Sequence, residues 1–244
     1  MNEPRAYDAV FFDLDGTLLP IDTDAFMQAY TSSAAAFAHE QGLDGTAVMH
    51  ALFAGVKAMA SHDGRRTNRD VFWDAFCTQT GLEADAVESM FARYYAGPFN
   101  DIARLAAPDP AAARAVATLK ERGYPVALAT MPMFPLEAVH ARLRWAGLDP
   151  ADFAFVTDYA CAHAVKPQTS YYEEALERAG VEAKRALMVG NNTREDGAIA
   201  RLGADLFFVT DHLIDPEDGV DATQCKHGTL AEFAAFCETL PRRA

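Results

Sequence analysis

The chain begins with one short apolar run and then changes to the spacing of helices. Residues 9–12 are apolar and stop at two carboxylates and a glycine, which is typical of a buried strand. From Asp22 to about Pro98, apolar residues recur three and four positions apart, glycines interrupt the pattern, and Thr67 is suited to begin a helix. This stretch contains no convincing strand, so the pattern predicts a bundle of four helices.

Helices and strands alternate from Asp109 to the end of the chain. The pattern predicts strands over residues 126–130, 153–156, 186–189 and 206–209. It predicts helices over residues 111–122, 136–145, 171–179, 195–202 and 230–240. Strands separated by helical crossovers form a parallel sheet that is covered on both faces. The first apolar run belongs to this sheet, so the helical stretch is an insertion in it.

These elements predict an α/β fold with a doubly wound, Rossmann-like parallel sheet and an inserted all-α helical bundle. The α/β core domain comprises residues 1–20 and 101–244, and the inserted domain comprises residues 21–100. The residues from Ala106 to Pro110 form the linker that returns the chain to the core.

Composition and charge exclude several classes of protein. The 244 residues are 50% hydrophobic and 23% charged, which is ordinary for a globular protein. A formal net charge of −14 disfavours sequence-independent binding of nucleic acid. The N-terminus lacks the apolar core of a signal peptide, and no run is long enough to span a bilayer. The four cysteines have no paired spacing, so we expect reduced thiols in a cytoplasmic protein without a membrane partner.

Polar residues stand where the predicted strands end, and ligands of open parallel sheets bind beyond those ends. The set comprises Asp13, Asp15, Thr130, Lys166, Asn191, Asn192 and Asp196. Each has a structural alternative when taken alone: Thr130 can simply end a strand, and Lys166 can be a surface lysine. Their order at successive strand ends favours a joint role. Carboxylates, a hydroxyl, an ammonium group and amides at one edge suit phosphoryl transfer.

The same residues resemble the motifs of the haloacid dehalogenase superfamily in its phosphatase form. The string DLDGTLL at residues 13–19 resembles the first motif, and Thr130 resembles the second. Lys166-Pro167 resembles the third motif, and residues 190–196 resemble the fourth. The helical insertion lies where many members carry a helical cap. The resemblance implies a Mg²⁺-dependent phosphatase that acts on a small phosphorylated metabolite.

The resemblance also implies a role for each residue. Asp13 is the nucleophile that forms an aspartyl-phosphate, and Asp15 is the general acid and base. Thr130, its neighbour Met131, and Lys166 bind the phosphate. The implied metal ligands are Asp13, Asp15, Asn191 and Asp196. Superfamily members that act on haloalkanoates or phosphonates lack an Asp at the second position, so Asp15 favours phosphate-ester hydrolysis.

Two alternatives to hydrolysis stay open. A phosphomutase of the superfamily shares the same residues. Asn191 also stands where the family usually has a metal-binding Asp, and its neutral oxygen predicts weaker binding of Mg²⁺. The second alternative is therefore a catalytically impaired phosphate-binding protein. Lys57 is the single lysine of the cap and suggests the Schiff-base chemistry of phosphonate hydrolases. Asp15 argues against this function.

The most polar stretch of the insertion is residues 61–68. One interpretation is a solvated loop between helices, since loops are polar by default. The other is a specificity loop in which Arg65 and Arg66 bind a second anionic group of the substrate. The sequence does not name the substrate, and it is compatible with a monomer or a homodimer.

Overall fold

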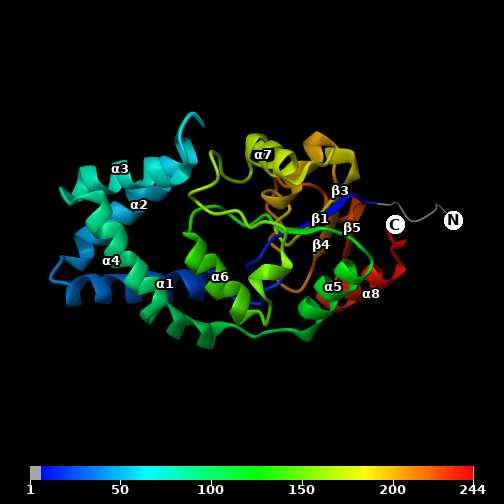
Figure 1. Ribbon diagram of the computed structural model, residues 1–244, viewed down its shortest axis with the longest axis horizontal. Helices are drawn as coiled ribbons and strands as arrows, with labels where there is room; N and C mark the ends of the chain where they lie inside the picture. Colours follow the sequence, from blue (N-terminus) through cyan, green and yellow to red (C-terminus); the bar gives the residue numbers. More distant parts are fainter. Residues whose placement is uncertain (1–6, 244) are drawn as a thin grey trace.

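The computed structural model describes residues 7–243, and its centre is a parallel sheet. Five strands lie in the order β2-β1-β3-β4-β5, and every neighbouring pair is parallel. The strands are β1 (Ala9–Phe12), β2 (Val126–Leu128), β3 (Ala186–Gly190), β4 (Asp205–Val209) and β5 (Lys226–Gly228). The predicted α/β fold is therefore confirmed (Figure 1).

The register brings the carboxyl ends of three adjacent strands to one edge of the sheet. Phe12 at the end of β1 pairs with Leu128 at the end of β2 and with Val189 near the end of β3. The polar residues that follow these strands in the sequence therefore lie at the same edge of the sheet. This edge is where an open parallel sheet binds its ligands.

Side chains of the strands alternate between two apolar layers, as the geometry of a strand requires. Val10 and Phe12 of β1 belong to the layer beneath α5 and α8, and Ala9 and Phe11 belong to the layer beneath α7 and η4. These elements are α5 (Pro110–Glu121), α7 (Thr169–Ala179), the 3₁₀ helix η4 (Asp196–Leu202) and α8 (Leu230–Thr239). Both faces of the sheet are thus covered, which explains why the strand sequences are almost continuously apolar.

The inserted stretch forms the predicted helices. They are α1 (Thr23–Glu40), α2 (Gly45–Ser61), α3 (Asn68–Thr80) and α4 (Ala84–Ala96). The side chains of Asp22, Asp44 and Thr67 accept backbone hydrogen bonds at the starts of α1, α2 and α3, so the predicted Thr67 cap is confirmed. These helices lie at one end of the molecule (Figure 1). The 3₁₀ helix η1 (Pro98–Leu105) crosses the proposed boundary at residue 100, and the division into domains stays a prediction.

Aromatic contacts join the insertion to the core. The rings of Phe99 in η1 and Trp145 in α6 (Leu136–Trp145) have centroids 5.0 Å apart. The rings of Phe26 in α1 and Phe134 are 6.1 Å apart. One continuous cluster of buried apolar side chains extends from the sheet into the helices. The insertion is therefore packed against the core and not only connected to it by the chain.

Two predicted elements differ from the structure, and one strand was not predicted. The strand predicted at 153–156 lies beside β2 and forms a bridge between Val156 and Leu128. Backbone hydrogen bonds from Ala154 to Val126 and from Thr157 to Leu128 flank this bridge, and the 3₁₀ helix η2 (Pro150–Asp152) precedes the segment. The helix predicted at 195–202 is the 3₁₀ helix η4. Strand β5 was not predicted, because its three residues include exposed Lys226 and His227 and carry no apolar signal.

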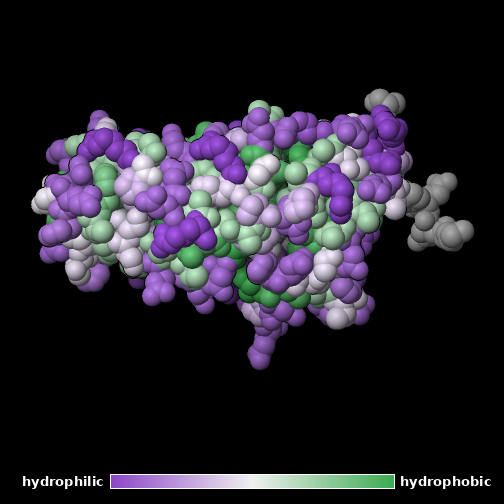
Figure 2. Space-filling view, turned by 90° about the horizontal axis from the view of Figure 1, so that it is seen from below, coloured by the Kyte–Doolittle hydropathy of each residue, from purple (hydrophilic) through white to green (hydrophobic). Residues whose placement is uncertain are grey.

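Much of the molecular surface is polar. Figure 2 shows mainly hydrophilic residues on one face of the molecule, with hydrophobic residues in smaller patches. All four cysteines are free thiols, as predicted. Among residues 7–243, no helix combines the length and the apolar character needed to cross a membrane.

Candidate active site

Lys166 joins two carboxylates from different loops at the edge of the sheet. Its Nζ donates to Oδ1 of Asp13 at 2.7 Å and to Oδ1 of Asp196 at 2.6 Å, and all three side chains are largely buried. Burial acts to lower the pKa of Lys166, but the charges of Asp13 and Asp196 outweigh burial and hold that pKa well above its ordinary value. Lys166 is thus a permanent cation beside the Asp13 carboxylate.

The Asp196 carboxylate also organises the turn after β3. Its Oδ2 accepts hydrogen bonds from the backbone N–H groups of Asn191 at 3.0 Å and Asn192 at 2.9 Å. A Cβ atom on Gly190 would lie 2.2 Å from this carboxylate, so the close approach requires glycine. Both oxygens of Asp196 are therefore engaged within the protein.

Asn191 lies buried next to Asp13, and its amide group is fixed at both ends. Its Oδ1 accepts a hydrogen bond from the Thr17 hydroxyl at 3.1 Å, and its Nδ2 donates to the carbonyl of His212 at 2.7 Å. The same Thr17 hydroxyl lies 3.5 Å from Oδ2 of Asp13. Thr17 consequently links the side-chain oxygens of Asp13 and Asn191.

Two of the four predicted metal ligands have side-chain oxygens placed to bind Mg²⁺. Within residues 7–243, no group of three or more His, Cys, Asp or Glu side chains is arranged to hold a metal ion. Asp13 and Asn191 nevertheless present two neighbouring oxygens, and Mg²⁺ commonly binds one or two protein oxygens and completes its shell with water and phosphate. The other two predicted ligands, Asp15 and Asp196, direct their side chains to Arg142 and Lys166.

Arg142 is a site residue that the sequence analysis missed. It lies on α6 with only 1% of its surface exposed, and its Nη1 forms an ion pair with Oδ2 of Asp15. Its guanidinium carbon is 4.5 Å from the centroid of the Phe134 ring. The available signal was its position among Ala138, Val139 and other buried residues of α6, where a charged side chain needs a partner.

The second carboxyl group, Asp15, has one engaged and one free oxygen. Its Oδ1 is buried and has no hydrogen-bond partner among the described residues, and the same holds for Nη2 of Arg142. Burial raises the pKa of the Asp15 carboxyl above its ordinary value, and the charge of Arg142 opposes this change. Asp15 is therefore suited to carry a proton on the oxygen that Arg142 does not bind.

The loop after β2 brings Thr130 and Met131 to the same site. The Thr130 carbonyl accepts hydrogen bonds from the hydroxyl groups of Thr157 at 3.0 Å and Tyr171 at 2.7 Å. These buried contacts fix the loop, and both Thr130 and Met131 line the cavity in front of Asp13. The structure thus brings these two predicted phosphate-binding residues next to the predicted nucleophile.

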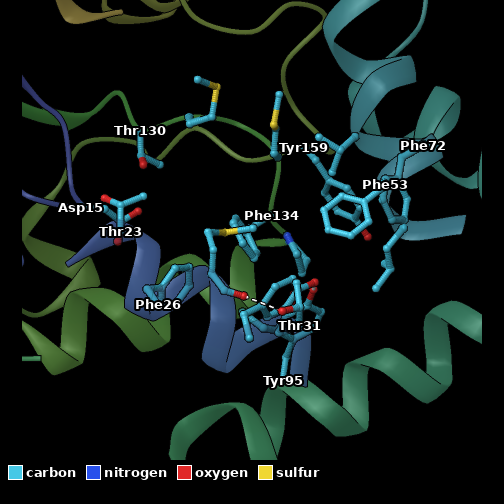
Figure 3. Close-up of a pocket in the computed structure, with 18 of the residues that line it drawn as sticks. Asp15, Thr23, Phe26, Thr31, Phe53, Phe72, Tyr95, Thr130, Phe134 and Tyr159 are labelled. Carbon is cyan, nitrogen blue, oxygen red and sulfur yellow. Dashed lines mark hydrogen bonds between the residues drawn. The ribbon is translucent and has the colours of Figure 1, made fainter. Parts of the chain in front are cut away.

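A cavity of about 440 Å³ extends from these residues into the helical insertion. Asp15 and Thr130 lie on one side of it, and Phe53, Phe72 and Tyr159 lie on the opposite side (Figure 3). The cavity is therefore formed by the sheet edge and the insertion together, with the reactive groups at one end.

The structure does not bring Arg65 and Arg66 to the cavity. Both side chains are exposed, Arg65 lies 3.3 Å from Asp63, and Arg66 pairs with Asp74. Neither arginine is among the described residues that line the cavity. The polar loop instead contacts the core through Asn68, whose Nδ2 donates to the carbonyls of Pro132 at 3.1 Å and Ala164 at 3.0 Å.

Comparison with known proteins identifies related sequences and folds. The sequence profile of the haloacid dehalogenase-like hydrolases matches residues 7–203. The plasmid-encoded protein CbbY of Cupriavidus necator is 29% identical over 198 residues, which cover 76% of this chain and 72% of that protein.

Solved structures share the fold at low sequence identity. A HAD phosphatase from Thermococcus onnurineus has a TM-score of 0.60 and 20% identity, covering 97% of this chain and 100% of that one. A CbbY mutant from Rhodobacter sphaeroides in complex with xylulose-1,5-bisphosphate has a TM-score of 0.57 and 17% identity, covering 93% and 96%. L-2-haloacid dehalogenases also share this fold.

Proposed function

Because the chain belongs to the haloacid dehalogenase-like hydrolase family, we propose that it hydrolyses the phosphate monoester of a small metabolite. The observation that carries this proposal is the Asp13 carboxylate, which lies against the Lys166 cation and two residues before a second carboxyl group, Asp15. A nucleophile and a general acid in the same cavity suit the cleavage of a phosphate ester. Asp15 also argues against haloalkanoate substrates, whose carbon–halogen bond needs no acid for the leaving halide.

The first step transfers the phosphoryl group to the protein. An oxygen of Asp13 forms a bond to phosphorus while the bond between phosphorus and the ester oxygen breaks. Asp15 Oδ1 gives its proton to the leaving alkoxide. Lys166 and the Thr130–Met131 loop stabilise the charge that develops on the phosphoryl oxygens. Mg²⁺ held by Asp13 and Asn191 would supply further neutralisation of this charge.

The second step regenerates the protein. Asp15, now ionised, accepts a proton from a water molecule whose oxygen forms a bond to phosphorus. The bond between phosphorus and Asp13 breaks, Asp13 returns as a carboxylate, and inorganic phosphate leaves. Arg142 keeps the Asp15 carboxyl in one orientation through both steps, because it binds the oxygen that carries no proton.

Hydrolysis is favoured over the two alternatives. A phosphomutase holds a second phosphate during its reaction, and no lysine, arginine or histidine lines the cavity within the described residues. A phosphate-binding protein without turnover has no need for a carboxyl group with a raised pKa beside the nucleophile. Asp15, which lines the cavity, supplies such a group.

Hydrolysis of p-nitrophenyl phosphate with Mg²⁺ and with EDTA tests the proposal. We expect Mg²⁺-stimulated turnover, and a loss of at least about 1,000-fold in Asp13→Asn, since an amide cannot attack phosphorus as a carboxylate does. Arg65→Ala, at an exposed position outside the cavity, is the matched control and should keep full activity.

Two results would contradict the proposal. Activity of a folded Asp13→Asn protein within a few-fold of wild type would remove Asp13 from the role of nucleophile. A wild-type protein that binds inorganic phosphate but hydrolyses no phosphate ester would be a phosphate-binding protein.

A further inference from the structure

The charged residues that line the cavity all have the same sign. They are Asp13, Asp15, Glu88, Glu137, Glu195 and Asp196, and no lysine, arginine or histidine lines the cavity within residues 7–243. The Lys166 cation lies beneath the Asp13 end, where its Nζ is committed to Asp13 and Asp196. The far end of the cavity therefore offers no counter-charge for a second phosphate or a carboxylate of a substrate.

Polar side chains at the far end bind one another. The hydroxyl groups of Tyr30 and Tyr95 lie 2.9 Å apart and share a hydrogen bond. The Tyr159 hydroxyl donates to Glu88 at 2.8 Å and lies 3.4 Å from the indole nitrogen of Trp73, which donates to it. A ligand rich in hydroxyl groups would give up its bonds to water here and find few free partners.

The remaining wall is apolar and comes from both parts of the molecule. The helices contribute Phe26, Met27, Met49, Leu52, Phe53, Val56, Phe72 and Phe91, and the core loops contribute Met131, Met133, Phe134 and Ile214. Four of these side chains are methionines, which adapt to ligands of different shape. Such a wall binds apolar groups through burial of their surface.

Two large apolar side chains of this wall stay exposed to water. Phe53 is 54% exposed and Ile214 is 42% exposed, although most apolar residues of the chain are buried. They come from α2 and from the loop after β4, on the two parts of the molecule that form the cavity. An apolar ligand in the cavity would cover the exposed apolar surface of both residues, whereas a polar ligand would leave that surface in contact with water.

Resting on the proposed phosphatase activity, we propose that the substrate is the phosphate monoester of an uncharged, apolar alcohol. Its single phosphate lies at Asp13, and its aromatic or branched aliphatic body fills the cavity between α1, α2, α3 and the Met131–Phe134 loop. Sugar phosphates and bisphosphates are poor substrates. The selectivity comes from the absence of cations among the lining residues, since Arg69 at the far end is paired with Glu88, and from the scarcity of free hydrogen-bonding groups there.

Two matched pairs of substrates test this proposal on the wild-type protein with Mg²⁺. Cyclohexylmethyl phosphate and glucose 6-phosphate both join a six-membered ring to phosphate through one CH₂ group, and they differ in the hydroxyl groups and the ring oxygen of the sugar. Hexyl phosphate and hexane-1,6-diyl bisphosphate differ in one phosphate. We expect kcat/KM at least about tenfold higher for the apolar member of each pair, with most of the difference in KM.

Variants at Phe53 test the charge argument at an exposed position that is outside the catalytic groups. Phe53→Lys should raise KM for hexyl phosphate several-fold and lower KM for the bisphosphate, because it adds a cation to the far end. Phe53→Leu should leave both values close to wild type. A circular dichroism spectrum and a urea unfolding midpoint equal to those of the wild type show that the Phe53→Lys protein is folded.

The outcomes separate this inference from the proposed function. Turnover of glucose 6-phosphate or of the bisphosphate equal to that of its apolar partner overturns the apolar substrate class and leaves the phosphatase intact. Failure to hydrolyse every phosphate ester, p-nitrophenyl phosphate included, overturns the phosphatase and the inference with it.

Discussion

Arg142 and Asp15 form an ion pair that is largely removed from water. A buried charge is expensive without its partner, since the desolvation of an ion costs several kcal/mol. Each member of the pair is thus tolerated because of the other. The pair also leaves Asp15 Oδ1 and Arg142 Nη2 without partners, so it is incompletely satisfied by the described residues.

Removing Arg142 alone should therefore be more harmful than removing both charges. We expect Arg142→Met to lower the free energy of unfolding by about 3–5 kcal/mol, and Arg142→Met combined with Asp15→Asn to lower it by less. Urea unfolding of the wild type, both single variants and the double variant measures the coupling between the two sites. Additive effects would mean that the ion pair contributes nothing of its own.

Asp15→Asn tests the proposed acid through the leaving group. The variant should slow hydrolysis of hexyl phosphate more than that of p-nitrophenyl phosphate, because a good leaving group needs little protonation. General acid catalysis contributes about 10²–10⁴-fold, so a difference of this order is expected between the two substrates. Steady-state kcat/KM values provide the comparison. Equal slowing would assign Asp15 another role or place a different step in control of the rate.

Asn191→Asp should have two opposite effects. A carboxylate next to Asp13 adds a charge for Mg²⁺, and a screened contact worth about 1–2 kcal/mol tightens binding about tenfold. The same substitution replaces the Nδ2 donor to the His212 carbonyl, at 2.7 Å, with an acceptor, which costs about 1–3 kcal/mol of stability. The Mg²⁺ concentration for half-maximal activity and urea unfolding in EDTA measure the two effects. An unchanged Mg²⁺ requirement would show that residue 191 does not contact the metal.

At the scale of elements, the start of α3 fastens the insertion to two core loops. Asn68 is completely buried, and its Nδ2 binds the carbonyl of Pro132, close to Thr130, and that of Ala164, close to Lys166. Its backbone N–H donates to Ala162 at 2.8 Å. This N–H has no partner within the helix, because it belongs to the first turn. The core therefore caps α3, and α3 in turn fixes the loops that carry the phosphate-binding residues.

Asn68→Ala should consequently disturb both stability and catalysis. Two buried carbonyls lose their donor, which we expect to cost about 2–4 kcal/mol of unfolding free energy. The KM for p-nitrophenyl phosphate should rise several-fold, because the loops of Thr130 and Lys166 lose their common support. Arg66→Ala, in the same polar loop but exposed, is the matched control and should change neither value. A stable Asn68→Ala protein with unchanged KM would show that Asn68 does not support the loops of Thr130 and Lys166.

For the whole molecule, the fold followed from the sequence because its strands are buried on both faces. Residues 9–12 and 186–189 are continuous apolar runs, and both form central strands. The edge strand β5 lacks this signal, because it exposes Lys226 and His227, and it was not predicted. The order of the strands depends on long-range pairing, such as β1 with β3, that no local pattern encodes.

The candidate site was predictable only in part for the same reason. Strand ends lie at one edge, so Asp13, Thr130 and Lys166 were identified from their positions along the chain. Arg142 and Asp15 are separated by 127 positions in the sequence. The apolar pattern of the helix that carries Arg142 does not indicate which residue pairs with it. Arg65 and Arg66 were selected for their charge, but their ion pairs with neighbouring Asp63 and Asp74 hold them on the surface.

The apolar wall of the cavity determines how ligand binding responds to temperature. Removing apolar surface from water gives a negative change in heat capacity, so the enthalpy of binding becomes more favourable on warming. Calorimetry of cyclohexylmethyl phosphate with the Asp13→Asn protein, which should not turn it over, measures this slope at several temperatures. We expect a clearly negative slope, and a smaller one for any glucose 6-phosphate that binds. An enthalpy that stays constant would mean that the ligand leaves the wall of Phe53, Phe72 and Ile214 in contact with water. With a negative slope, the affinity for substrate is highest at the temperature where the enthalpy of binding passes through zero, and it falls on warming and on cooling from there.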